Sequence, residues 1–230
     1  MGDEIRKRIE TIREKILDAM KISGVKEVQI LAATKTVEPE RIKEAIEAGI
    51  TLIGENRVQE AKAKIEVLGK ERVQWHMIGH LQRNKVKHAI KLFDMIESVD
   101  SLPLVEELEK RLSKAGKEME ILVEVNIGKE DTKFGVMPEE VKDFIYKLKD
   151  YPHLKCVGLM CIPPWFEDPE KVRPYFVQMR RIKEEIEKEG FPHVEMKILS
   201  MGMSDDYVIA VEEGANLVRL GRAIFGERKG

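Results

Sequence analysis

The chain has 230 residues, of which 43% are hydrophobic and 36% are charged, and its formal net charge is -2 at pH 7. This balance argues against a nucleic-acid-binding surface, because such surfaces carry a clear basic excess. No apolar stretch reaches the length of a membrane span, and the charged N-terminus lacks the apolar segment of a signal peptide. Cys156 and Cys161 are expected to pack in the core. We therefore expect a cytoplasmic protein that binds neither nucleic acid nor membrane.

Apolar runs alternate with amphipathic stretches along the chain. The amphipathic pattern predicts an opening helix over residues 3–23 and further helices over residues 39–49, 58–69, 83–93, 101–115, 137–150, 169–189 and 204–214. The apolar runs predict strands over residues 28–34, 51–55, 73–80, 94–100, 118–128, 153–162, 194–202 and 215–226. Strands and helices therefore alternate strictly from the first strand to the last.

Strict alternation of strands and helices predicts an α/β fold with a parallel sheet. Eight βα units in a chain of this length favour a single closed (β/α)8 TIM barrel, with residues 1–230 forming one domain. An open, doubly wound sheet is the alternative. Such a sheet usually has a glycine-rich, nucleotide-binding first turn, but here that turn reads TKTVEP, so the barrel is preferred.

Polar residues fall where the expected strands end, which in this fold is where active sites lie. Lys35 ends the first strand, Asn56 follows the second, and His80 ends the third. Each of them could simply mark the start of a loop. For His80 a functional and a structural interpretation stay open, whereas His76 is expected to be a packed core histidine.

The ends of the last two strands are the most informative. In SMGMSDD, Ser200, Gly202 and Ser204 precede a helix, where free amides and hydroxyls suit a phosphate group. The alternative is a simple helix cap at Ser204. In LGRAIFG, Gly221 permits close approach of the backbone. The loops after the seventh and eighth strands form the usual phosphate site of this fold.

A phosphate site, a strand-end lysine across the rim and an arginine between them suggest the cofactor pyridoxal 5′-phosphate (PLP). A desolvated lysine can lose its proton and form a Schiff base with an aldehyde. The ring nitrogen of the cofactor needs an acidic or an arginine partner, for which Arg219 is the candidate. The alternatives are that Lys35 is a surface lysine and that Arg219 pairs with a carboxylate such as Glu55.

A family resemblance rests on motifs that follow one another along the chain: ATKT, IGENRVQE, WHMIGHLQRNK, ESVDS, VNIGKEDTKFG, GLMCIPP, LSMGMSDD and VRLGRAIFG. Over essentially the whole chain they resemble the PLP homeostasis protein family, which is related to the N-terminal barrel of alanine racemase. The resemblance implies that Lys35 carries PLP as an internal aldimine and that Arg219 faces the pyridine nitrogen.

The resemblance also implies a wider set of cofactor contacts. Ser200 and Ser204, with backbone from Gly221 and Arg222, would hold the phosphate. The other cofactor-binding residues that we expect are Asn56, His80, Met160, Met201 and Gly202.

Turnover is not expected from this resemblance. Family members lack the C-terminal β-domain of the racemases, which supplies a second catalytic tyrosine, and this chain ends at FGERKG after the last strand. Racemisation needs an acid or base on each face of the substrate α-carbon, and Lys35 can serve only one face. We therefore expect a PLP carrier for intracellular PLP homeostasis, without catalytic or metal-binding residues.

The expected carrier is a monomer or weak dimer, and apo PLP-dependent enzymes are its expected recipients. Two enzymes are the alternatives. One is a PLP-dependent amino-acid racemase, and the other is a PLP-independent barrel enzyme that acts on a phosphorylated metabolite.

Overall fold

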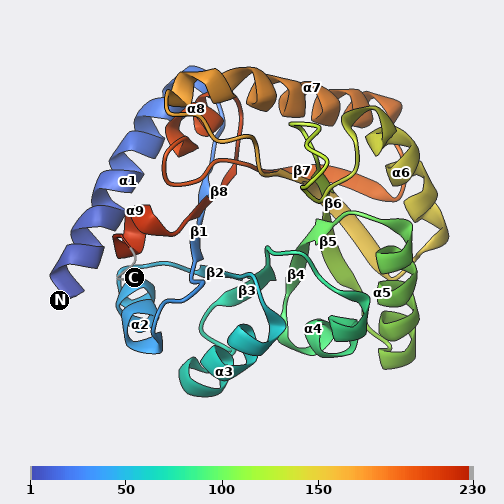
Figure 1. Cartoon of the computed structure of the whole chain (residues 1–230), viewed down its shortest axis with the longest axis horizontal. Helices are drawn as coiled ribbons and strands as arrows, with labels where there is room; N and C mark the ends of the chain where they lie inside the picture. Colours follow the sequence, from blue (N-terminus) through green and yellow to red (C-terminus); the bar gives the residue numbers. More distant parts are fainter. Residues whose placement is uncertain (1, 228–230) are drawn as a thin grey trace.

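The computed structural model describes residues 2–227, whose strands form a closed parallel barrel in chain order (Figure 1). The strands are β1 (Gln29–Ala33), β2 (Leu52–Glu55), β3 (Gln74–Met77), β4 (Met95–Val99), β5 (Met119–Val125), β6 (Leu154–Cys161), β7 (Val194–Ser200) and β8 (Leu217–Leu220). β1 closes the barrel against β8 through pairs such as Leu31 with Arg219. The predicted TIM barrel is confirmed, and the open sheet is excluded.

Helices surround the barrel (Figure 1). In residues 2–227 they are α1 (Gly2–Ser23), α2 (Pro39–Glu47), α3 (Val58–Leu68), α4 (Val86–Leu92), α5 (Leu102–Ala115), α6 (Val141–Lys147), α7 (Arg173–Glu189), α8 (Tyr207–Glu212) and α9 (Arg222–Phe225). Pro39 occupies the first turn of α2, and Gly116 and Gly190 end α5 and α7 in the left-handed conformation. No helix in this part of the chain is both long and apolar enough to cross a membrane.

The predicted end of the eighth strand is wrong. The apolar pattern predicts a strand through residue 226, but β8 ends at Leu220 and the next residues form α9. β1, the partner of β8, ends at Ala33. With no further strand to pair with, the amides of the last two residues of α9 donate to the carbonyl of Gly221 instead. Gly221 therefore lies in a turn at the mouth of the barrel.

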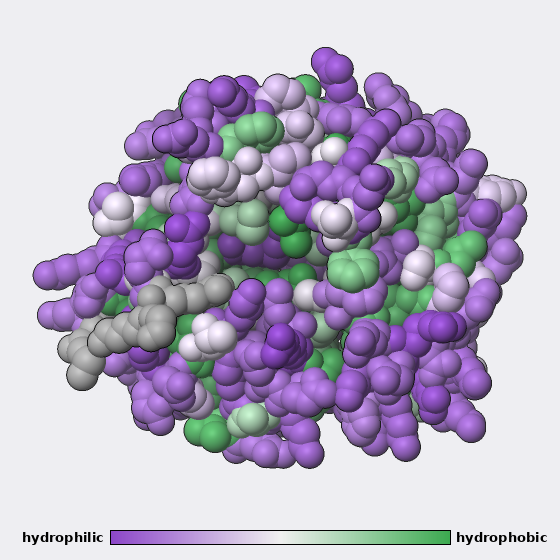
Figure 2. Space-filling model, in the orientation of Figure 1, coloured by the Kyte–Doolittle hydropathy of each residue, from purple (hydrophilic) through white to green (hydrophobic). Residues whose placement is uncertain are grey.

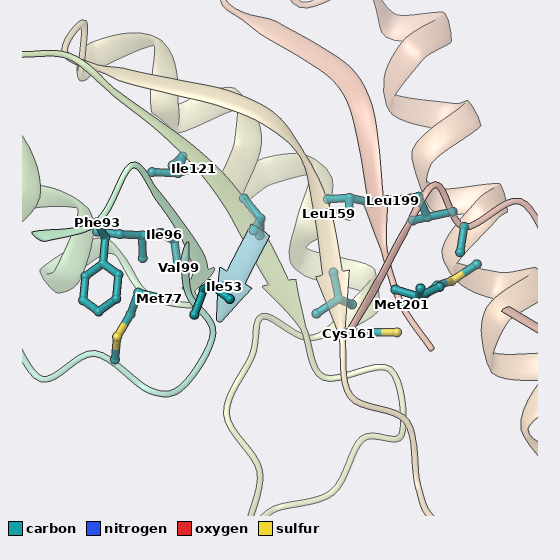
Figure 3. Close-up of a cluster of buried hydrophobic side chains, with 14 of the residues drawn as sticks. Ile53, Met77, Phe93, Ile96, Val99, Ile121, Leu159, Cys161, Leu199 and Met201 are labelled. Atoms are coloured by element: carbon teal, nitrogen blue, oxygen red, sulfur yellow. The ribbon is translucent and has the colours of Figure 1, made fainter. Parts of the chain in front are cut away.

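Apolar side chains fill the layer between the barrel and its helices. Figure 3 shows part of this layer, where side chains of several strands meet, among them Ile53, Ile96 and Leu159. Cys156 and Cys161 are buried in the core, as expected, and both are free cysteines. This layer holds the strands in register and so determines where their C-terminal ends meet.

The barrel interior changes from apolar to polar along the strands. Side chains alternate between the two faces of a strand, so every second residue points inward. Leu31, Leu52 and Leu217 form a small apolar cluster there. Two residues beyond Leu217, on the same face of β8, Arg219 is buried. The polar part of the interior thus lies toward the C-terminal ends of the strands.

Candidate functional site

A cavity of about 280 Å³ opens at the C-terminal end of the barrel. Its lining comes mainly from the loop after β6 and from the turns after β1, β7 and β8, with Asn56 and Ile78 added from the ends of β2 and β3. In the space-filling view the centre of the molecule is hollowed, with apolar side chains inside a mostly hydrophilic rim (Figure 2). The expected site residues that line the cavity are Lys35, Asn56, Ser204, Arg219, Gly221 and Arg222.

Lys35 lies on an exposed turn just beyond β1. The turn is tight, because the Val37 amide donates to the Thr34 carbonyl (2.9 Å) and Thr36 adopts a φ of +62°. A residue with a side chain in this conformation costs about 1–3 kcal/mol. The surrounding structure therefore has to hold this turn, and with it Lys35, at the edge of the cavity.

A buried ion pair outside the barrel wall holds the Lys35 turn. Lys64 of α3 donates to the Thr34 carbonyl (2.7 Å) and to Glu55 Oε1 (2.6 Å). Burial raises the pKa of Glu55 and outweighs its hydrogen bonds from Lys64 and Thr34. Because Glu55 pairs with Lys64, the suggested ion pair of Arg219 with Glu55 is wrong. Lys64 was not predicted, although its position three residues after Ala61 places it on the buried face of α3.

The turns after β7 and β8 meet beside the Lys35 turn. The Ala223 amide donates to Ser204 Oγ (3.1 Å), and Arg222 pairs with Asp205 (2.5 Å). None of the hydrogen bonds in residues 2–227 uses the amides of Ser204 and Asp205. Free amides next to a hydroxyl suit an anion such as a phosphate group.

Two glycines allow these turns to pack closely. A Cβ on Gly221 would lie 3.3 Å from the carbonyl oxygen of Ala33, so the β8 turn runs directly alongside the end of β1. Gly202 has a φ of +93°, and a Cβ there would lie 2.5 Å from the Cβ of Ala210. Gly202 therefore shapes its turn from behind, against α8, and is not part of the cavity lining.

Arg219 points from β8 into the barrel and contributes to the cavity lining, although it is only 4% exposed. Its Nη1 donates to Ser200 Oγ (2.6 Å), and its Nη2 donates to the Cys161 carbonyl (2.7 Å). Ser200 in turn donates to Glu97 Oε2 (2.6 Å). The guanidinium is thus held from the interior of the barrel, with its other N–H groups left for the cavity side.

Glu97 is fully buried in the same network. Its Oε1 lies 2.7 Å from His76 Nδ1. Burial raises the pKa of Glu97, but the hydrogen bond and charge of His76, the charge of Arg219 and the hydrogen bond from Ser200 together bring it below its ordinary value. Glu97 is therefore an anion inside the barrel. His76 is buried as predicted, but it is hydrogen-bonded rather than merely packed.

The other expected site residues are not part of the cavity lining. Met160, Ser200 and Met201 are fully buried. His80 is partly exposed and stacks on Phe134, with ring centroids 3.7 Å apart. For His80 the structure thus supplies a packing partner, and a functional role stays a prediction.

The loop after β6 forms one side of the cavity. Pro163, Pro164 and Trp165 line it, and Trp165 is 75% exposed. Asp205 and Asp206 line it as well and were not predicted. The carboxylate of Asp206 accepts from the Met203 amide (2.6 Å), which closes the turn before α8.

The cavity brings together a primary amine, a buried guanidinium and free amides. An amine can attack a carbonyl carbon, whereas a guanidinium and an amide N–H can only donate hydrogen bonds. The site therefore suits an anionic ligand that carries an electrophilic carbonyl group.

Comparison with known proteins assigns the barrel to a class. The model of the family described as "Alanine racemase, N-terminal domain" matches residues 3–229. The alanine racemase of Clostridium difficile 630 superposes with a TM-score of 0.74, over 99% of this chain and 58% of that chain. At 16% sequence identity this likeness shows the fold alone.

Relatives with higher sequence identity assign the chain to a family within this class. The chain is 43% identical over 227 residues to the pyridoxal phosphate homeostasis protein of Aquifex aeolicus (strain VF5), which covers 96% of this chain and 97% of the relative. It is 34% identical over 232 residues to the protein of that name from Escherichia coli (strain K12), over 98% and 97% of the two chains. PipY of Synechococcus elongatus PCC7942, solved with PLP bound, is 32% identical with a TM-score of 0.84, over 96% of this chain and 100% of that chain. The chain belongs to the PLP homeostasis protein family, as its motifs predicted.

Proposed function

We propose that the protein binds PLP, holds it as a Schiff base on Lys35 and takes part in intracellular PLP homeostasis without efficient turnover. The observation that carries this proposal is the convergence of Lys35, Arg219 and Ser204 on one cavity. The family membership, and the PLP bound to the related PipY, support the same ligand.

The residues present fit this cofactor. When bound, PLP supplies an aldehyde and an electron-withdrawing pyridine ring. Lys35 offers the amine that forms the C=N bond with the aldehyde carbon, with loss of water. The hydroxyl of Ser204, the free amides of its turn and the backbone of Gly221 and Arg222 offer donors for the phosphate. Asn56 borders the same cavity.

The presence of Arg219 in the cavity supports binding of PLP without efficient turnover of a substrate. In this proposal its guanidinium faces the ring nitrogen of the cofactor. A guanidinium has no acceptor atom, so it can only donate to that nitrogen and disfavours its protonation. A ring that stays unprotonated withdraws electrons less strongly, which weakens chemistry at the amino-acid α-carbon.

The cavity lining also supports a carrier over a racemase. Racemisation needs one acid or base on each face of the substrate α-carbon. Among residues 2–227, no tyrosine lines the cavity opposite or beside Lys35. The described lining thus holds no counterpart of the catalytic tyrosine of the racemases, and its carboxylates, Asp205 and Asp206, are engaged by Arg222 and by the Met203 amide.

Absorption spectroscopy combined with borohydride reduction tests the binding step. We expect PLP to change the visible absorbance of the protein, and peptide mapping after reduction to find the pyridoxyl group on Lys35. Lys35→Ala should lose both signals. Lys43→Ala removes an exposed lysine of α2 that pairs with Glu47, and it should behave like the wild type. An unchanged absorbance response in Lys35→Ala contradicts the proposal.

Two further measurements separate a carrier from an enzyme. Loaded protein incubated with single L-amino acids in D₂O should produce no more inversion or α-deuteration than PLP alone. Steady turnover that disappears in Lys35→Ala would instead show a racemase. A colourless protein that does not respond to PLP would favour a PLP-independent enzyme.

The last part of the proposed role is the delivery of PLP to other proteins. We expect a cytoplasmic protein, monomeric or weakly dimeric, whose recipients are apo PLP-dependent enzymes. Loaded protein should restore the activity of such an apoenzyme, and sedimentation of the protein alone should show its oligomeric state. Loaded protein that leaves the apoenzyme inactive would exclude delivery while leaving PLP binding intact.

A further inference from the structure

A chain of buried polar side chains runs across the barrel interior. It links four strands: His76 of β3, Glu97 of β4, Ser200 of β7 and Arg219 of β8. The exposed fractions of these residues are 2%, 0%, 0% and 4%. Because β4 and β7 are not neighbours in the barrel, the hydrogen bond between Glu97 and Ser200 has to pass through the interior.

Ser200 has no donor left for a phosphate. A serine hydroxyl carries a single proton, and that of Ser200 is donated to Glu97 Oε2 (2.6 Å). Its oxygen already accepts from Arg219 Nη1 (2.6 Å). A phosphate group offers mainly acceptor oxygens, and turning the hydroxyl toward it would take a hydrogen bond from a buried carboxylate. Ser200 is also absent from the lining of the cavity, whereas Ser204 is part of it.

The network instead fixes the orientation of Arg219. Its guanidinium is held at two points, by Ser200 Oγ (2.6 Å) and by the Cys161 carbonyl (2.7 Å). Glu97 supplies the negative charge behind Ser200 and is itself held by His76. A guanidinium anchored in this way presents its remaining N–H groups to the cavity in one orientation.

We propose that Ser200 and Glu97 are positioning residues that orient Arg219 toward the ring of the bound cofactor, and that Ser200 is not a phosphate ligand. This inference rests on the proposed function. It revises the role that the family resemblance implies for Ser200 and assigns a role to Glu97, which the sequence did not single out.

Comparing PLP with pyridoxal, which lacks the phosphate, tests the proposal. Ser200→Ala should weaken the binding of both compounds by a similar factor, about tenfold, because each needs the oriented Arg219. The ratio of the two affinities should therefore stay at its wild-type value. The internal hemiacetal of free pyridoxal lowers its affinity for every variant alike, so it cancels when these ratios are compared between proteins.

Two matched variants calibrate this comparison. Ser204→Ala, on the phosphate side of the cavity, should weaken PLP several-fold and leave pyridoxal unchanged. Ser98→Ala removes another fully buried serine hydroxyl, which donates to the Gly79 carbonyl (2.7 Å), and should change neither affinity. A Ser200→Ala protein that loses affinity for PLP alone overturns the proposal, as does one that keeps both affinities.

Glu97→Gln tests the second positioning residue. It should weaken both compounds as Ser200→Ala does, and the double variant should be no weaker than the more severe single variant, because both changes act on one network. Additive losses contradict a shared role. If Glu97→Gln does not fold, the affinity ratio of Ser200→Ala still decides the proposal. A wild-type protein that does not respond to PLP refutes the proposed function itself, before any variant is compared.

Discussion

Two buried carboxylates near the mouth of the barrel have pKa values that are shifted in opposite directions. Glu55, at the end of β2, faces α3 outside the barrel and binds Lys64 through Oε1 (2.6 Å). Glu97, on β4, lies inside the barrel and has both oxygens hydrogen-bonded, to His76 and to Ser200. The pKa of Glu55 is raised, whereas that of Glu97 is lowered.

The difference shows that hydrogen-bond partners and nearby charges decide whether the effect of burial on the pKa prevails, as it does for Glu55, or is overcome, as it is for Glu97. Both carboxylates are fully buried, and burial alone would raise both pKa values. Glu55 leaves Oε2 without a hydrogen-bond partner in residues 2–227. Glu97 has donors on both oxygens and the positive charge of Arg219 nearby. Each carboxylate also supports one half of the site, Glu55 the Lys35 turn through Lys64 and Glu97 the arginine.

Removing the cation on the Glu55 side should have the largest effect. Lys64→Met keeps the apolar stem but removes the ammonium group from Glu55, which keeps only the hydrogen bond from Thr34, and from the Thr34 carbonyl, which keeps only the Val37 amide. Breaking a buried pair in this way costs about 3–5 kcal/mol. Urea unfolding at pH 8 measures this loss of stability, and PLP affinity should fall with it, because the Lys35 turn loses its support.

The Lys64 prediction has a matched control on the same helix. Lys62→Met removes an exposed lysine of α3 that lies 3.7 Å from Glu66, and it should change stability by less than about 1 kcal/mol. Adding Glu55→Gln to Lys64→Met should recover part of the loss, because the unpaired charge is gone. A loss below about 1 kcal/mol for Lys64→Met would mean that Glu55 does not need its cation.

A third carboxylate extends the comparison to pH dependence. Glu124 of β5 is 6% exposed, and its side chain has no hydrogen bond within residues 2–227. Burial and the charge of Asp100 raise its pKa to about 7, against the opposing charge of Arg219. The folded state thus binds this proton more tightly than the unfolded state, so Glu124 should lower stability as the pH rises from about 4.5 to about 7.

Glu124→Gln should remove this pH dependence. From the shift between 4.5 and about 7, the stability difference between wild type and variant should change by up to about 3 kcal/mol between pH 4.5 and pH 8, in favour of the variant at high pH. Urea unfolding at both pH values measures it. Glu120→Gln, an exposed carboxylate on the same strand, serves as control. Parallel stability curves for wild type and Glu124→Gln would show that folding leaves the pKa of Glu124 unchanged.

The Glu97 side of the mouth depends on backbone shape as well as on charge. Gly202→Ala places a Cβ 2.5 Å from that of Ala210 at a φ of +93°, and should cost about 2–3 kcal/mol of stability. Gly190→Ala at the end of α7 introduces a similar positive φ with open space around it, and should cost only about 1 kcal/mol. Thermal unfolding compares the two, and equal losses would mean that the turn after β7 relaxes freely.

The fold could be predicted from the sequence because it follows from local pattern. Apolar runs separated by amphipathic stretches are enough to indicate strands and helices that alternate. The exception, α9, arises because β1 ends at Ala33 and leaves the chain after Leu220 without a strand to pair with. The end of a partner strand is a property of the folded barrel and is not visible in the segment itself.

The candidate site was predictable only in part. Lys35, Ser204 and Arg219 stand at strand ends or in turns, where a motif identifies them. The pairing of Ser200 with Glu97 joins residues 103 positions apart in the chain, and it depends on which strands face each other across the barrel. The motif could not show that Ser200 points inward while Ser204 points to the cavity.

Trp165→Phe should have the smallest effect on stability, and it also provides a test of where the ligand binds. Trp165 lines the cavity and is 75% exposed, whereas Trp75 is fully buried in the core. Trp165→Phe should change stability by less than about 0.5 kcal/mol, because it alters an exposed side chain. It should nevertheless remove most of the change in tryptophan fluorescence that PLP causes, since Trp165 is the tryptophan at the cavity. A fluorescence response of undiminished size in Trp165→Phe would mean that Trp165 does not report on the ligand. With a response confirmed in the wild type, the same titration can rank the Lys64 and Glu97 variants and show which half of the site contributes more to affinity.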